Sequence, residues 1–207
     1  MRRTTDPKYD RTLSTSISGP LAGVDEVGRG ALAGPVVAAA VVLPRDIDLP
    51  GITDSKRMTR LQREEGYDRI LNCAVAWSVG IVGPDVVDRI NVRQGTLQAM
   101  REAVAALGLS PAMVLVDGRD DPGIETVVRT VIGGDGISLS IAAASVVAKV
   151  TRDRIMADLA NEHPVYGFER HVGYATDFHR RAIRRHGPAT PHRMSFLGSI
   201  LQERLPL

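Results

Sequence analysis

The sequence predicts an α/β fold with a mixed five-stranded sheet, helices on the faces of the sheet, and a C-terminal helical extension. Two strand-length apolar segments come first, and further strands then alternate with helix-length segments, an order typical of a mixed sheet covered by helices. The 207 residues are 43% hydrophobic and 24% charged, which is ordinary for a globular protein with a sizeable core. From residue 164 onwards only short helices and loops are expected.

The first two strands are expected at residues 21–27 and 35–43, on either side of a glycine-rich turn. Thr59 is a candidate N-cap for a helix that runs to about residue 72, and a third strand follows at 74–82. Pro84 is suited to the first turn of a helical region that reaches residue 107, with a break near Asn91. Short strands at 112–116 and 125–132 precede a long helix at 140–162.

Three segments follow from this pattern. Residues 1–18 are polar, have no apolar centre and are expected to form a mobile tail, which excludes a secretory signal. Residues 19–163 form the α/β domain, and residues 164–207 form a helical extension packed on it. No apolar run is long enough to cross a membrane, and the single cysteine, Cys73, suits a reducing compartment, so we expect a cytoplasmic protein.

Acidic residues stand where three of the predicted strands end. Asp25 and Glu26 are adjacent in the run AGVDEVGRG, Asp117 follows the fourth strand, and Asp135 follows the fifth. Ligand sites in open α/β sheets lie beyond strand ends, so parallel neighbouring strands would bring four carboxylates together. A single such acid is usually a turn residue or a helix cap, and that alternative stays open on turn chemistry alone.

Four carboxylates without cysteine or histidine beside them suit Mg²⁺ or Mn²⁺ rather than Zn²⁺. Two such ions, about 3.5–4 Å apart, can hold the attacking and leaving oxygens of a phosphodiester displacement. The chain has neither a Walker-type loop nor a Gly-x-Ser-x-Gly motif, which argues against a P-loop nucleotidase and a serine hydrolase.

The C-terminal quarter is basic although the net charge is only +2. Six arginines face a single Asp177 between Arg170 and Arg193, and all five histidines lie between His163 and His192. This composition predicts a positive surface suited to a polyanion, although a solvated helix face in an arginine-rich chain would look the same.

Six runs of residues together identify a family. They are AGVDEVGRG at 22–30, TDSK at 53–56, VLVDG at 114–118, IAAASVVAKVTRD at 141–153, Gly173-Tyr174, and HRMSF at 192–196. The first and the fourth of these runs are highly specific. On these runs the chain resembles ribonuclease HII, the bacterial type 2 ribonuclease H, over about residues 20–197 and in the order expected for the family.

The resemblance implies a ribonuclease H-like sheet and assigns Asp25, Glu26, Asp117 and Asp135 as catalytic, metal-binding carboxylates, with Asp25 bridging two ions. It implies substrate contacts from a further set of residues. Gly28, Arg29 and Gly30 match the turn that binds a ribonucleotide 2′-hydroxyl, Tyr174 matches the tyrosine that stacks on the next sugar, and Lys56, Ser145 and Lys149 neighbour the site.

The implied activity is hydrolysis of the RNA strand of RNA–DNA hybrids and cleavage on the 5′ side of single ribonucleotides in duplex DNA. Such an activity serves ribonucleotide removal and RNA primer removal. The alternatives are another ribonuclease H-like nuclease and a non-catalytic nucleic-acid-binding module. We expect a monomer without a membrane partner, and no room in residues 1–18 for the extra N-terminal domain of ribonuclease HIII. Val172 and Gly136-Ile137 depart from the usual family pattern.

Overall fold

The protein is described here by a computed structural model of residue 5 and residues 7–202. Its centre is one five-stranded sheet with the strand order β3-β2-β1-β4-β5. β1 is antiparallel to β2 and β2 is antiparallel to β3, whereas β4 runs parallel to both β1 and β5. The strands are β1 (Leu21–Val27), β2 (Val36–Val42), β3 (Ala76–Val82), β4 (Met113–Asp117) and β5 (Val127–Val131). The mixed sheet expected from the sequence is confirmed.

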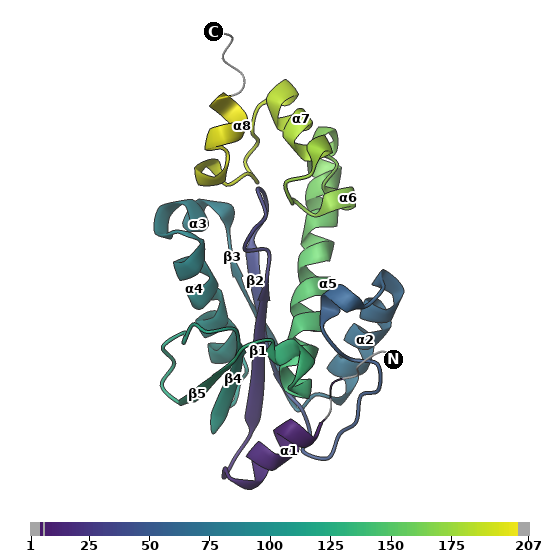
Figure 1. Ribbon diagram of the computed structural model, residues 1–207, viewed down its shortest axis with the longest axis vertical. Helices are drawn as coiled ribbons and strands as arrows, with labels where there is room; N and C mark the ends of the chain where they lie inside the picture. Colours follow the sequence, from purple (N-terminus) through teal and green to yellow (C-terminus); the bar gives the residue numbers. More distant parts are fainter. Residues whose placement is uncertain (1–4, 6, 203–207) are drawn as a thin grey trace.

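Helices flank the sheet on both faces and extend beyond one end of it (Figure 1). The α-helices are α1 (Lys8–Thr15), α2 (Arg60–Cys73), α3 (Pro84–Ile90), α4 (Val92–Ala105), α5 (Leu139–Glu162), α6 (Phe168–His171), α7 (Asp177–His186) and α8 (Gly198–Gln202). Short 3-10 helices are η1 (Ser55–Arg57), η2 (Gly134–Gly136), η3 (Pro164–Tyr166) and η4 (Met194–Phe196). Thr59 caps α2 through a capping box, and the predicted break at Asn91 separates α3 from α4.

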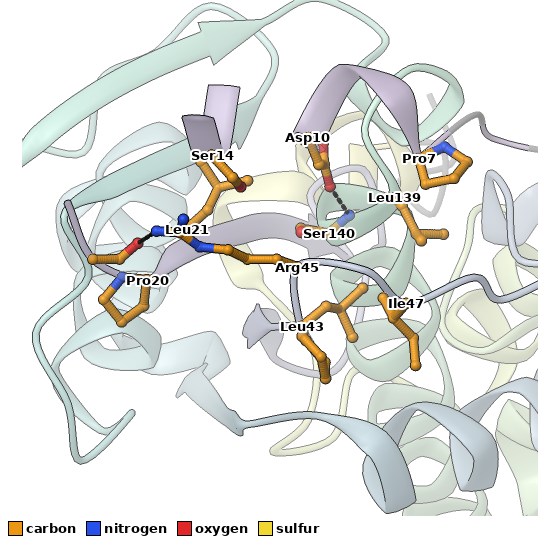
Figure 2. A pocket seen from close by; sticks show the side chains of 12 residues that line it. Pro7, Asp10, Ser14, Pro20, Leu21, Leu43, Arg45, Ile47, Leu139 and Ser140 are labelled. Carbon is orange, nitrogen blue, oxygen red and sulfur yellow. Dashed lines mark hydrogen bonds between the residues drawn. The ribbon is translucent and has the colours of Figure 1, made fainter. Parts of the chain in front are cut away.

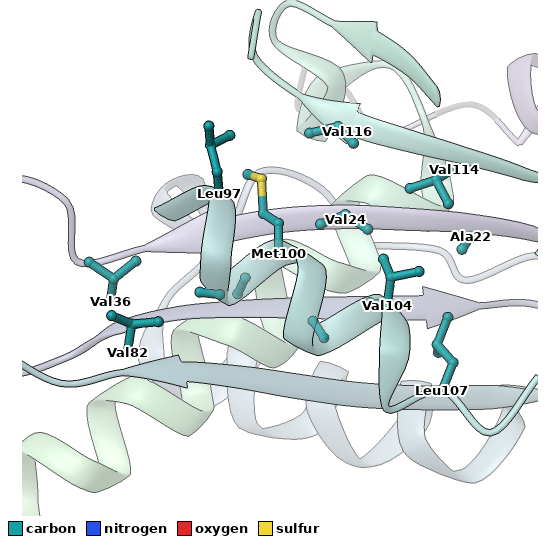
Figure 3. Close-up of a cluster of buried hydrophobic side chains, with 14 of the residues drawn as sticks. Ala22, Val24, Val36, Val82, Leu97, Met100, Val104, Leu107, Val114 and Val116 are labelled. Carbon is teal, nitrogen blue, oxygen red and sulfur yellow. The ribbon is translucent and has the colours of Figure 1, made fainter. Parts of the chain in front are cut away.

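The face of the sheet covered by α4 holds one hydrophobic core (Figure 3). Its buried side chains come from alternate positions of the strands and from one side of α4, as the two-residue period of a strand requires. They include Val24, Val36, Val114, Met100 and Val104. Burial of this face fixes the register of β1, so that Asp25, the residue after Val24, points to the opposite face.

The opposite face is covered by α5 and α2, which enclose a second core. α5 approaches β1 so closely that a Cβ atom on Gly23 would overlap the backbone of Ser140 and Ile141. A glycine in the centre of this strand therefore lets the first turn of α5 lie against the strand that carries Asp25.

The expectation of a mobile tail is wrong for residues 8–15, which form α1 and pack on the rest of the protein. The Oδ2 atom of Asp10 accepts a hydrogen bond of 2.7 Å from the backbone N–H of Ser140 in the first turn of α5 (Figure 2). Asp10 also lines a cavity of about 40 Å³ together with Leu21, Arg45 and Leu139. Residues 1–4 and 6 lie outside the described part of the chain.

Residues 164–202 pack against the C-terminal half of α5 and the segment after β1. This third core buries Leu32, Met156, Phe168, Ile183 and Leu197. The short helices expected here are present, whereas a domain boundary at residue 163 stays a prediction. Among the described residues, no helix is long and apolar enough to span a membrane.

Candidate functional site

Three carboxylates meet at the edge of the sheet where β1, β4 and β5 lie side by side. Asp25, Asp117 and Asp135 each offer an oxygen, and these atoms all lie within 4.8 Å of one another. Asp25 comes from β1, Asp117 ends β4, and Asp135 lies in η2 after β5. The parallel pairing of these strands brings the acids together, as the sequence predicts. The Oδ1 atom of Asp117 also accepts a 2.7 Å hydrogen bond from the N–H of Gly134, which fixes η2 beside β4.

Asp25 is the most enclosed acid of the group, with 6% of its surface exposed. Burial raises the pKa of its carboxyl well above the usual range, and the neighbouring Glu26 and Asp117 carboxylates raise it further. The hydroxyl of Ser145 on α5 donates a hydrogen bond that partly offsets this effect on the pKa. A buried acid crowded by like charges is an unfavourable arrangement that a cation would relieve.

Glu26 stands apart from the other three acids. As the next residue on the strand it projects to the other side, and its Oε1 atom lies 3.3 Å from the Arg29 guanidinium. The pKa of Glu26 is raised overall. Burial is the largest cause and the Asp117 charge adds to it, whereas the Arg29 guanidinium opposes both. The four-acid cluster is thus a group of three carboxylates with Glu26 adjacent and held by an arginine.

Lys56 and Asp54 bring η1 to the acid cluster. Burial acts to lower the pKa of the Lys56 ammonium, but the pKa is raised overall because Asp25, Asp54, Asp135 and Asp117 surround it. Asp54 caps η1 by accepting the Lys56 N–H at 2.9 Å, and it also shares a carboxyl–carboxyl hydrogen bond with Asp135. Burial, followed by the Asp54 charge, raises the pKa of Asp135.

The sequence alone does not identify Asp54 as part of the site. An acid before a short helix is explained by its capping role. The spacing of nearby residues does not indicate the contact with Asp135, which lies 81 residues further along the chain. The same element places the Ser55 hydroxyl 2.9 Å from the Ser145 hydroxyl, so that η1 and α5 support Asp25 jointly.

The turn of Gly28, Arg29 and Gly30 follows β1 directly, and its conformation requires glycine. Gly28 has φ +94°, and a Cβ atom there would overlap the Arg152 side chain and lie 2.7 Å from the Pro35 carbonyl oxygen. Gly30 is exposed and a Cβ atom there would meet nothing within 4 Å, so the turn is open to a ligand on that side.

Two arginines with 0% exposure support this turn and the loop that follows it through hydrogen bonds to backbone carbonyls. Arg152 of α5 donates to the carbonyls of Pro35, Ala33 and Val172 at 2.9, 3.0 and 2.8 Å. Arg193 donates twice to the Gly34 carbonyl and, at 2.9 Å, to that of Arg29. Burial, with the Arg152 charge adding to it, lowers the pKa of Arg193 to about 10, so Arg193 stays charged at neutral pH; burial also lowers the pKa of Arg152.

Tyr174 lies beside the same arginines. The Arg152 guanidinium carbon is 5.7 Å from the centre of the Tyr174 ring. Val172, two residues before Tyr174, has φ +44°, a conformation rare for a β-branched residue, and its carbonyl accepts a hydrogen bond from Arg152. The departure from the family pattern at Val172 therefore occurs at a strained position two residues before Tyr174.

Lys149 does not join the acids. Its Nζ atom lies 2.6 Å from the Asp153 carboxylate one turn further along α5, and Asp153 is also 4.0 Å from Arg63. The structure thus places Lys149 in an ion-pair group on the surface of α5, although Ser145, one turn earlier, contacts Asp25.

Residues 22–198 match the family model for ribonuclease HII. The chain belongs to the ribonuclease HII family. Over 188 residues it is 52% identical to a ribonuclease HII from Halalkalibacterium halodurans, a match covering 91% of this chain and 71% of the relative.

Solved structures of ribonuclease HII relatives share the fold. The crystal structure of ribonuclease H2 from Pyrococcus horikoshii superposes with a TM-score of 0.73 at 26% identity, covering 89% of this chain and 98% of the other. The ribonuclease HII in the PCNA:RNase HII complex from Archaeoglobus fulgidus gives a TM-score of 0.70 at 25% identity, with coverages of 84% and 94%.

The acid cluster of this protein fits a hard divalent cation. Its donors are all carboxylate oxygens and they lie within reach of one ion. The pKa of Asp25 is raised by burial and then by the neighbouring acids, so its negative charge lacks a partner that such an ion would supply. Membership of the family makes the protein a hydrolase of the ribonuclease H type.

Proposed function

We propose that this protein is a metal-dependent endoribonuclease that cuts RNA joined to DNA, including single ribonucleotides in duplex DNA. The observation that carries the proposal is the position of the Gly28–Gly30 turn, which directly follows the strand that bears Asp25. One end of β1 thus presents both a metal-binding acid and an open backbone turn that a ribose could approach. A contact to the 2′-hydroxyl is what distinguishes RNA from DNA.

Asp25, Asp117 and Asp135 would hold Mg²⁺ or Mn²⁺, with Asp25 shared between two ions and Glu26 as the fourth metal-binding acid. When bound, these ions would supply an activated water and stabilise the leaving oxygen. Lys56, surrounded by the same acids, would meet a non-bridging phosphate oxygen, and Ser145 would orient the Asp25 carboxylate. The products would be a 3′-hydroxyl and a 5′-phosphate.

Tyr174 is proposed to stack on the sugar that follows the cleaved bond. A 2′-hydroxyl there would crowd the ring and a deoxyribose would not, so the flat ring favours DNA on the 3′ side. The turn requires a ribonucleotide and the ring prefers a deoxyribonucleotide, which together select the RNA–DNA junction. Cleavage is then expected on the 5′ side of the last ribonucleotide.

The deciding experiment incubates the protein with end-labelled duplex DNA that contains one ribonucleotide, and with the same duplex made wholly of DNA. Cleavage of only the first duplex, in Mg²⁺ or Mn²⁺ and not in excess chelator, is the expected result. Ca²⁺ should bind without supporting turnover, because its looser coordination misplaces the attacking water. Equal cleavage of the all-DNA duplex would favour a DNA-reading nuclease, and binding without cleavage would favour a non-catalytic module.

A further inference from the structure

Three histidines that the composition assigns to a positive surface are buried next to Tyr174. His171, His179 and His192 are 7%, 0% and 3% exposed. The rings of His171 and His179 stack with their centroids 4.4 Å apart, and those of His179 and His192 are 5.2 Å apart. The ring of Phe168 packs edge-on against His171 and His179, so an aromatic core rather than solvent surrounds the imidazoles.

The histidines form a hydrogen-bonded chain that ends on Tyr174. His192 Nδ1 lies 2.9 Å from the backbone nitrogen of Ala189, whose N–H it can accept, and 3.1 Å from the Ala189 carbonyl oxygen. His192 Nε2 and His179 Nε2 are 3.1 Å apart, and His179 Nδ1 is 2.9 Å from the carbonyl oxygen of Tyr174.

The Tyr174 carbonyl fixes the neutral tautomers of this chain. A carbonyl oxygen can only accept, so His179 carries its proton on Nδ1 and accepts at Nε2. His192 then carries its proton on Nε2 and donates to His179, which leaves its Nδ1 to accept the N–H of Ala189 rather than to donate to the Ala189 carbonyl. The reverse pair of tautomers would set an unprotonated His179 Nδ1 against the Tyr174 carbonyl.

His171 fixes the same turn from the other side. Its Nε2 atom is 2.8 Å from the Tyr166 carbonyl, its Nδ1 accepts the N–H of Gly173 at 3.2 Å, and its own carbonyl accepts the N–H of Tyr174 at 2.9 Å. Gly173 is confined as well, since a Cβ atom there would overlap the carbonyl oxygen of Ala33. The backbone of Tyr174 is therefore bound at both its N–H and its carbonyl.

We infer that His179 and His192 are positioning residues for Tyr174: His192 sets the tautomer of His179, and the Nδ1–H of His179 holds the Tyr174 carbonyl so that the ring faces the substrate sugar. The inference rests on the proposed role of Tyr174 as the group that reads the sugar after the cut. It assigns the buried histidines a role that does not require them to contact metal or nucleic acid.

The charges around the chain favour the neutral forms. The pKa of His179 falls to about 4, mainly through burial, with the His171 and His192 charges adding to the effect and the Tyr174 carbonyl opposing it. Burial also lowers the pKa of His192, with His163 and His171 adding to the effect and the Ala189 backbone opposing it. Burial lowers the pKa of His171, which Arg170 lowers further and the Tyr166 carbonyl and Glu169 oppose. The chain is thus neutral at pH 7, as the tautomer assignment requires.

The functional test compares His179→Phe with Tyr174→Ala on two substrates, a lone ribonucleotide in DNA and a long RNA–DNA hybrid, under single-turnover conditions at pH 7.5. Phenylalanine keeps the aromatic volume and removes both hydrogen bonds. We expect His179→Phe to slow cleavage at the lone ribonucleotide by about fivefold to tenfold, the effect of one or two lost hydrogen bonds, with a smaller loss on the hybrid. The double variant should be no slower than Tyr174→Ala, because both changes remove one function.

His186→Phe is the matched control, because His186 is an exposed histidine on the same helix and should leave the ratio of the two rates unchanged. Equal losses from His179→Phe on both substrates, or full additivity with Tyr174→Ala, would overturn the inference and leave the proposed function standing. Failure of the unaltered enzyme to cut at a ribonucleotide would instead overturn the proposed function.

A measurement on the unaltered protein tests the chain independently of activity and of how the variants fold. Imidazole ¹⁵N chemical shifts at pH 7.5 should show His179 protonated only at Nδ1 and His192 only at Nε2, and the His179 shifts should stay unchanged down to pH 5.5. The opposite tautomers at pH 7.5, or protonation of His179 within that range, would overturn the inference.

Discussion

At the scale of single residues, the acids at the strand ends divide into different roles. Asp25 lies at the centre of the cluster, and its carboxylate is hydrogen-bonded by Ser145 and by the N–H of Glu26 at 2.7 Å. Asp25→Asn preserves the shape of the side chain and removes the charge a bridging ligand needs. We expect the single-turnover rate to fall by at least about a hundredfold with substrate affinity nearly unchanged.

Cleavage rates and a binding isotherm on the same duplex would measure both effects of Asp25→Asn. Asp117→Asn and Asp135→Asn should be similarly severe, and each should add little to Asp25→Asn because the three acids act as one unit. Near-normal cleavage by Asp25→Asn would contradict the metal assignment.

Asp54 offers a second test at this scale, since its carboxyl is bonded to that of Asp135 and raises the pKa of that acid. Asp54→Asn keeps the cap on η1 and the contact to Asp135 but removes one negative charge from beside the metal site. We expect the Mg²⁺ concentration for half-maximal rate to increase while the maximal rate changes by less than about tenfold. A loss as large as that of Asp135→Asn would instead make Asp54 a metal ligand.

The sequence predicts Asp25, Asp117 and Asp135 as a group because strand ends and parallel pairing are readable from apolar runs. It does not predict the ion pair of Lys149, because spacing on a helix shows that Ser145 and Lys149 share a face but not that Asp153, one turn on, binds the lysine; the substrate contact of Lys149 stays a prediction. Ion pairs of this kind depend on side-chain torsions that no local pattern specifies.

At the scale of elements, α1 is the part of the fold that the sequence analysis missed. The segment is polar overall, but Tyr9, Leu13 and Ile17 recur every four residues and pack on the cluster around Leu21 and Ile141. This four-residue spacing indicates a helix. The charged and hydroxyl residues between these positions instead favour the prediction of a mobile tail.

The hydrogen bond between Asp10 and α5 should make a measurable contribution to the free energy of unfolding. Asp10→Ala removes the acceptor for the Ser140 N–H and the negative charge near the start of α5, which should lower the free energy of unfolding by about 1 kcal/mol. Asp10→Asn keeps an acceptor oxygen and should cost less. Urea unfolding of the three proteins, with unchanged denaturant dependence, would measure this; equal losses from both variants would show that the hydrogen bond contributes nothing.

At the scale of the whole molecule, the buried histidines couple stability to pH. The pKa of His179 falls from 6.5 in a model compound to about 4 in the folded protein, so the unfolded chain binds more protons between these values. The contribution of neutral His179 to the stability of the folded protein is fully present above about pH 6.5 and is lost as the pH falls through about 4. The raised pKa of Asp25 changes the free energy of unfolding with pH in the opposite direction. The folded protein holds this proton more tightly than the unfolded chain, so the stability that Asp25 contributes is lost as the pH rises.

A comparison of the protein with His179→Phe isolates the histidine contribution, because Asp25 is common to both. Urea midpoints measured from pH 7.5 to pH 4.5 should fall more steeply for the unaltered protein than for the variant. Parallel curves would show that His179 is protonated equally in the folded and unfolded states.

The sheet, the order of elements and the acid cluster follow from the sequence because each depends on short-range periodicity and on the rules of strand pairing. The two buried arginines do not, because each joins segments more than a hundred residues apart in the sequence. The histidine chain does not either, because its members, although close in the sequence, are polar residues that look like surface residues. An arginine-rich C-terminal segment predicts a positive surface, yet Arg193 is fully enclosed by the loop that it supports.

The hydrogen bonds from Arg193 to Gly34 and Arg29 also impose an order on assembly. They join positions 159 and 164 residues apart, whereas the last of the acids, Asp135, is synthesised well before Arg193. A growing chain therefore contains all the acids that we propose to bind metal while the turn that we propose to recognise a ribose still lacks its support. On the ribosome, the support for the proposed recognition turn is thus synthesised after the acids of the proposed metal site.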